Sequence, residues 1–110
     1  MASTARSGNR VAVTSDAYAE VFSSKSNDGN DGPGMMGVLF VAESKKADGS
    51  DVTGGVTVEV TGAVVEEFTL QPGDSHPITS ADINTKIKRV RVKRAATGVD
   101  GSITWRQLVV

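Results

Sequence analysis

Three short stretches of the sequence hold residue types that catalyse reactions or bind metal ions. The first, Asp74-Ser75-His76, contains the residue types of a hydrolase triad. Consecutive residues of an extended chain point to alternate faces, whereas a triad is assembled from residues that meet in space. We therefore expect His76, between a turn and a proline, to be an exposed loop residue. It is the only histidine and there is no cysteine, which excludes an imidazole pair and a thiolate as metal ligands or nucleophile.

The second stretch, Asn27–Gly32, has the composition of a calcium-binding loop. An EF-hand needs oxygen ligands at loop positions 1, 3 and 5 and a glutamate at position 12. With Asn27 at the first position, Gly29 and Val38 fall where two of these ligands belong. The pattern therefore favours a flexible Asn/Asp/Gly loop over a metal site. Asp28 and Asp31 are the only candidate ligands in it.

The third stretch is the pair Glu66 and Glu67. Glycosidases need two carboxylates that converge at about 5 to 9 Å, but neighbouring residues on a strand point apart. The glycine-rich patterns of nucleotide-binding loops do not occur in the sequence. We therefore expect a protein that is not an enzyme and that holds no cofactor and no metal.

The elements that carry these stretches are predicted to be strands. The chain contains 16 valines, ten threonines and four isoleucines but only three leucines, and branching at Cβ suits a pleated sheet. Twelve glycines separate the apolar runs, and no run has helical periodicity. Short strands with turns roughly every 8 to 12 residues predict an all-β protein, a small antiparallel β-sandwich or barrel.

Several strands can be placed from their patterns. Residues 35–42 are almost continuously apolar, which predicts a central strand covered on both faces. In residues 56–61 valine alternates with polar residues, as in a strand with one wet face. Residues 75–79 contain Pro77, which predicts an edge strand. Ser80 is expected to cap a short helical turn after it.

The chain is expected to form one domain with an arm. Residues 1–22 are predicted to be an extended, flexible amino-terminal arm or first short strand, and residues 23–110 the β-sandwich domain. The first ten residues contain no apolar block, so they do not resemble a secretory signal. No apolar run reaches the roughly 18 residues of a membrane span, and we expect no membrane partner.

Charge is distributed unevenly, although the net charge is only −1. Residues 11–85 contain 12 acidic and three basic residues, whereas residues 86–110 contain seven basic and one acidic residue. This contrasts an acidic body with a basic carboxy-terminal hairpin. Half of the 12 basic residues lie in one predicted strand, at Lys86, Lys88, Arg89, Arg91, Lys93 and Arg94.

Three interpretations of this basic strand compete. It is an edge strand protected by charge against aggregation, a nucleic-acid-binding surface, or a basic interface that meets an acidic surface of another copy or of a partner. The near-zero net charge and 5% aromatic content argue against nucleic acid. The asymmetry favours an interface or edge protection. As candidate interface residues we take Arg6, Arg10, Lys86, Lys88, Arg89, Arg91, Lys93 and Arg94.

The layout of residues 56–110 resembles small virion proteins of tailed bacteriophages, including capsid decoration (cement) and head-fibre base proteins. The resemblance lies in the run Phe68–Asp74 followed by Ile78, in the basic strand Ile87–Val92 and in the final strand with Thr104 and Trp105. It implies a non-enzymatic, oligomeric structural protein located in the virion, whose arm reaches neighbouring subunits. No site residue is transferred by it.

The expected function is therefore that of a virion structural protein that binds and stabilises capsid or neck proteins through oligomeric interfaces. The alternative is a carbohydrate- or surface-recognition β-sandwich, for which Tyr18 is the candidate contact because Trp105 is expected in the core. A nucleic-acid-binding β-barrel is a lower-ranked third interpretation, and it depends on Arg89 and Arg91.

Overall fold

The computed structural model describes residues 10–24 and 34–108, and these form eight strands and one short helix. Within them, no helix is long and apolar enough to cross a membrane. In chain order the elements are β1 (Val11–Val13), β2 (Ala19–Ser23), β3 (Gly37–Ala42), β4 (Val56–Thr61), β5 (Val65–Leu70), β6 (Ser75–Thr79), α1 (Ser80–Ile83), β7 (Arg89–Arg94) and β8 (Gly101–Gln107).

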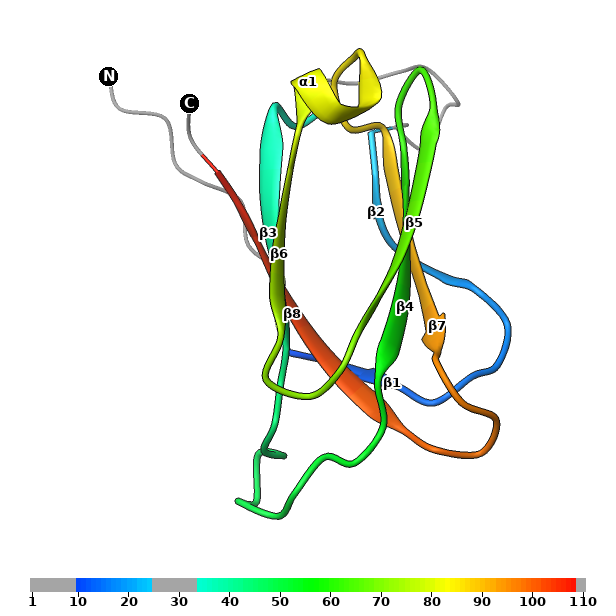
Figure 1. Cartoon of the computed structure of the whole chain (residues 1–110), viewed down its shortest axis with the longest axis vertical. Coiled ribbons are helices and arrows are strands. Elements are labelled where there is room, and N and C mark those ends of the chain that lie inside the picture. Colours follow the sequence, from blue (N-terminus) through cyan, green and yellow to red (C-terminus); the bar gives the residue numbers. More distant parts are fainter. Residues whose placement is uncertain (1–9, 25–33, 109–110) are drawn as a thin grey trace.

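The strands form two antiparallel sheets that face each other (Figure 1). Sheet A has the order β1-β8-β3-β6, and sheet B has the order β2-β7-β4-β5. Neither sheet closes on itself, so the fold is a β-sandwich and the predicted all-β class is confirmed. Along the chain, every connection between consecutive strands changes sheet except the one between β4 and β5.

The core lies between the sheets and is built from alternate residues of the strands. In β4, Val56, Val58 and Val60 are fully buried while Glu59 points outward, as the period-2 pattern predicts. Phe22 of β2 packs edge-on against Trp105 of β8, with ring centroids 5.9 Å apart. The buried cluster comprises Val13, Met35, Val38, Phe40, Ala42, Val56, Val58, Val60, Leu70, Ile78, Ile83, Ile87, Val90, Val92, Ile103 and Trp105.

The basic strand β7 lies in the middle of sheet B, between β2 and β4. Edge protection is therefore the wrong explanation for its charge, because both of its backbone edges are already paired. The idea of a basic carboxy-terminal hairpin is also wrong, since β7 and β8 belong to different sheets. Alternation of valine and arginine identifies a strand but not its position in a sheet.

The amino-terminal segment contributes a strand to each sheet. β1 pairs with β8, with Val11 opposite Ile103, and β2 pairs with β7, with Ala19 opposite Val92. The arm expected over residues 1–22 thus contains two strands of the sandwich where the structure describes it, and residues 1–9 lie outside the described part. The expected boundary at residue 22 falls inside β2.

The connection from β5 through β6 to α1 is formed as its local sequence predicts, with one change. Gly73 adopts φ +94°, and the Asp74 carboxylate accepts a hydrogen bond from the Gln71 backbone N–H at 2.9 Å. β6, with Pro77, is the predicted edge strand of sheet A. The helix cap is Thr79 rather than Ser80, because the Thr79 backbone N–H donates to the Asp82 carboxylate at 2.8 Å.

Candidate functional site

The triad residue types do not form a catalytic arrangement. His76 is not the exposed loop residue that the sequence predicts. It lies in β6 opposite Phe40, is half-buried, and its ring centroid is 4.3 Å from that of Phe68. The turn and the proline on either side suggested a loop, but an extended edge strand accommodates Pro77 equally well. Ser75 and His76 are adjacent in an extended strand and so project from opposite faces of it.

The carboxylates are also separated from one another. In the register of sheet B, Glu67 lies opposite Glu59 and Glu66 lies opposite Val60, so the two glutamates of β5 face different sides. Among the residues that the structure describes, no group of three His, Asp or Glu is placed to hold a metal ion. The calcium candidates Asp28 and Asp31 lie outside the described residues.

On the outer face of sheet B, two of the three arginines of β7 lie next to one carboxylate, that of Glu59. Arg91 Nε donates to Glu59 Oε1 at 2.8 Å, and Arg91 Nη2 lies 2.6 Å from the same oxygen in an ion pair. Arg89 Nη2 lies 3.9 Å from that oxygen. The Glu59 side chain is only 13% exposed. Glu59 therefore compensates part of the charge that the sequence alone assigned to a partner. Arg91, one of the two arginines on which the nucleic-acid interpretation depends, is already paired.

Tyr18, from the segment between β1 and β2, extends this network across sheet B. The Arg91 guanidinium lies 4.9 Å and the Lys93 ammonium 4.6 Å from the centre of its ring. Its hydroxyl donates to Glu67. Burial, and after it the hydrogen bond to Glu67, raises the pKa of Tyr18 above its ordinary value. Because Arg91 and Lys93 already lie against its ring, Tyr18 is poorly placed to stack on a sugar ring, as the carbohydrate alternative requires.

The remaining candidate interface residues do not extend this surface. Arg94 pairs with Asp100 at 2.7 Å and with Asp16 at 3.6 Å. Lys86 and Lys88 have no polar side-chain partner among the described residues, and Lys86 lines an open hollow next to Met36. Arg10 belongs to the other sheet and Arg6 lies outside the described residues. The seven candidates that the structure describes therefore do not form one continuous basic face.

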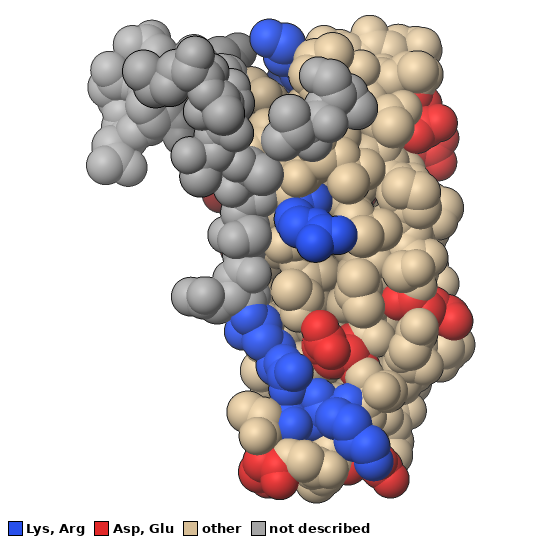
Figure 2. All heavy atoms as spheres, turned by 90° about the vertical axis from the view of Figure 1, so that its left-hand side faces the viewer, with Lys and Arg blue, Asp and Glu red and all other residues tan. Residues whose placement is uncertain are grey.

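The outer face of sheet A is turned towards the viewer in Figure 2. Leu39 and Val41 of β3 project outward and are only half-buried, so this central strand is not covered on both faces as predicted. They line a hollow of about 200 Å³ with Thr104 and Arg106 of β8. Arg106 is exposed and has no partner among the described residues. Arg106 was not among the candidate interface residues of the sequence. Because it follows the buried Trp105 in a strand, the alternation of side chains would have placed it on this outer face.

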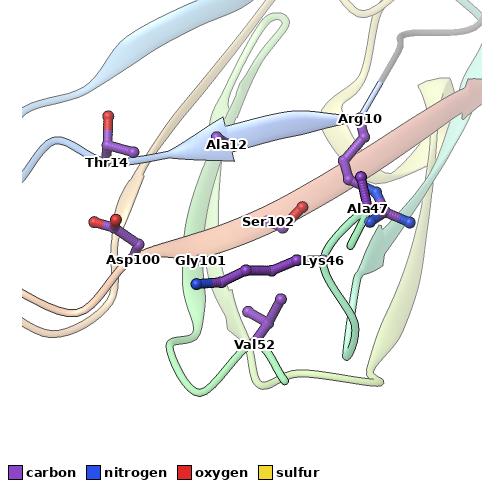
Figure 3. A pocket seen from close by; sticks show the side chains of 9 residues that line it. All are labelled: Arg10, Ala12, Thr14, Lys46, Ala47, Val52, Asp100, Gly101 and Ser102. Atoms are coloured by element: carbon purple, nitrogen blue, oxygen red, sulfur yellow. The ribbon is translucent and has the colours of Figure 1, made fainter. Parts of the chain in front are cut away.

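A deeper pocket of about 330 Å³ lies beside this hollow, at the edge of sheet A formed by β1 and β8 (Figure 3). Two cations, Arg10 and Lys46, lie on its rim and Ala12 and Val52 form apolar walls. Arg10 donates to the Lys45 carbonyl at 2.8 Å and lies 3.8 Å from Glu43. The Lys46 ammonium forms no ion pair or side-chain hydrogen bond among the described residues. Hydrogen bonds from Ser50, and after them the charge of Lys46, lower the pKa of the nearby Asp48 carboxyl.

The remaining polar residues of the pocket are Thr14, Asp100 and Ser102. Asp100 is held by Arg94, so its carboxylate is already paired. Ser102 is 6% exposed and its buried Oγ has no hydrogen-bond partner. Such an unsatisfied hydroxyl costs free energy until an acceptor reaches it. No pattern in the polar loop of residues 43–55 indicated that Lys46 would face this pocket.

Comparison of the chain with protein-family models, with curated proteins and with solved structures gave no match.

Proposed function

We propose that the protein is a non-enzymatic virion structural protein that binds and stabilises capsid or neck subunits through oligomeric interfaces. The observation that carries the proposal is the outer face of sheet A, where half-buried Leu39 and Val41 lie beside the unpaired cation Arg106. The phage-like layout of residues 56–110 supports the choice of a virion as the assembly.

An interface of this kind needs an apolar centre and charged groups at its rim. Leu39, Val41 and the Thr104 methyl group supply the apolar centre. Arg106 supplies positive charge that no described residue pairs, and Lys46, in the neighbouring pocket, adds a second exposed cation. Complementary charges at a rim mainly guide encounter and set register, and the burial of apolar surface contributes free energy. We infer that the partner surface is apolar with acidic residues at its border.

Sheet B is the weaker candidate for the same role. An acidic partner that approached Arg91 would have to compete with Glu59, which accepts a hydrogen bond from it and forms an ion pair with it. It would also displace Tyr18 from Arg91 and Lys93. Breaking such pairs removes much of the gain from any new ones. Arg106 requires no such exchange.

The proposal is tested on assembled particles purified from the source. We expect mass spectrometry to detect the chain in them and cryo-electron microscopy to show its density with the outer face of sheet A against a subunit. In rebinding assays Arg106→Glu should lower occupancy, whereas Lys88→Glu, a matched reversal of an unpaired cation elsewhere, should not. Absence of the chain from purified particles would overturn the proposal.

A further inference from the structure

Unpaired carboxylates are rare in the described part of this acidic chain. All of the described Asp and Glu side chains form a hydrogen bond or ion pair within the chain except Glu20 and Glu66. Glu20 lies directly opposite Arg91 in the sheet, close to positive charge. Glu66 lies opposite Val60, on the edge strand β5, and is exposed. Glu66 is therefore the carboxylate without a nearby cation.

The pocket between β1, β8 and residues 46–52 has the complementary chemistry. Arg10 and Lys46 place two positive charges in its lining. Arg10 lies 3.8 Å from Glu43, and Lys46 interacts electrostatically with Asp48 but forms no ion pair or side-chain hydrogen bond among the described residues. The one carboxylate of the pocket, Asp100, is paired with Arg94. The apolar walls suit the methylene groups of a glutamate side chain. A carboxylate oxygen would also bring an acceptor towards Ser102 Oγ, which has none.

We propose that this pocket binds the Glu66 side chain of a second copy of the chain. The inference rests on the proposed function, since it specifies one of the oligomeric interfaces that function requires. β1 is an edge strand of sheet A and β5 is the opposite edge of the sandwich, beside β6. One molecule therefore presents its pocket and its Glu66 on different sides. Contacts of this type are head-to-tail and generate a ring or an open chain of subunits.

The test is the mass of the full chain in solution, measured by light scattering over a range of concentrations at low salt. The wild-type mass should rise with concentration above that of the 11.4 kDa monomer. Lys46→Glu and Glu66→Lys each turn an attraction into a repulsion, and each should weaken association roughly tenfold. Both side chains are exposed and neither forms an ion pair or side-chain hydrogen bond among the described residues, so both variants should remain folded.

The charge swap decides whether the two residues meet. A chain that carries both Lys46→Glu and Glu66→Lys restores opposite signs across the contact and should associate more tightly than either single variant. Lys88→Glu and Glu20→Lys are matched reversals of unpaired groups elsewhere and should associate like the wild type. A monomeric wild type, controls that weaken association equally, or a double variant no better than the single ones would each overturn the inference.

This assay contains no other virion component, so its outcome is separate from that of the particle experiment. If the chain stays monomeric but is found in particles, the proposed Glu66 contact is contradicted and the proposed function still stands. If the chain self-associates through Glu66 but is absent from particles, the proposed function is contradicted and the proposed contact still stands. Association that persists in Lys46→Glu would point to another surface, such as the hollow at Leu39, and would contradict the pocket assignment.

Discussion

On the outer face of sheet B, Arg91 forms a hydrogen bond and an ion pair with Glu59, whereas on the outer face of sheet A, Arg106 has no described partner. The first residue belongs to a run of six basic residues within nine positions and the second is isolated in the sequence. The arginine in the dense run is thus the paired one, although Lys86 and Lys88 of the same run have no polar side-chain partner among the described residues. For this fold, the availability of a charge depends on what lies opposite it in the sheet, and local density along the chain is a poor guide to binding surfaces.

The strongest test of this comparison removes the carboxylate at the centre of sheet B. Glu59→Gln removes the carboxylate that Arg89 and Arg91 share. Their side chains are 42% and 32% exposed, so solvent screens part of the loss, and we expect the free energy of unfolding to fall by about 2 kcal/mol. Urea denaturation measures it. Glu66→Gln, on the neighbouring strand but without a partner, is the matched control and should change stability little. Equal effects would show that the Glu59 network contributes no more than a solvated charge.

A second test exchanges one arginine on each face for methionine, which keeps much of the stem. Arg91→Met removes a hydrogen bond and an ion pair with Glu59 and leaves that carboxylate partly unpaired, so we expect the free energy of unfolding to fall by about 2 kcal/mol in thermal or urea unfolding. Arg106→Met should leave stability nearly unchanged, because no described contact is lost. If Arg106→Met is the more destabilising of the two variants, the conclusion that Arg91 stabilises the fold and that Arg106 is free to bind a partner is contradicted.

The smallest effect is expected at Tyr18, the only tyrosine of the chain. Its raised pKa means that the fold favours the neutral phenol. This contribution is complete below the ordinary tyrosine pKa of about 10 and is lost as pH rises through the higher pKa of the folded state. Tyr18→Phe removes the hydrogen bond to Glu67 and should cost about 1 kcal/mol at neutral pH.

Tyrosinate absorbance during an alkaline titration measures this pKa directly, since no other tyrosine contributes. Glu67→Gln should shift the transition towards lower pH, because it removes both the acceptor and its negative charge. The same titration in concentrated urea should return the ordinary value. A native transition at the ordinary tyrosine pKa would mean that Tyr18 does not lie against sheet B in solution.

Much of the fold follows from local sequence. The alternation of valine with polar residues in 56–61 and 89–94 places side chains on the correct faces, and Pro77 correctly marks an edge strand. Strand order does not follow in this way, because β7 pairs with β4, about thirty residues earlier, and with β2, about seventy residues earlier. No local pattern encodes which strands become neighbours.

The candidate site was less accessible to sequence reasoning for the same reason. That Arg91 meets Glu59 is a consequence of register between two distant strands. That Lys46 borders a pocket depends on how a polar loop folds back over Ser102. Arg106 is the exception, since its parity relative to Trp105 gives its face without knowledge of the partner strand. A count of charged residues in the sequence does not distinguish Arg91, Lys46 and Arg106 from one another.

The alternation of the chain between the two sheets has a consequence for how the protein is made. β1 pairs only with β8, and β2 pairs only with β7, so the first two strands have no sheet partner until the last two have been synthesised. Only β4 and β5 can pair with a neighbour in sequence as they emerge from the ribosome. Such long loop closures make folding slow and late. β1 and β2 therefore remain open to other contacts until β7 and β8 have been made.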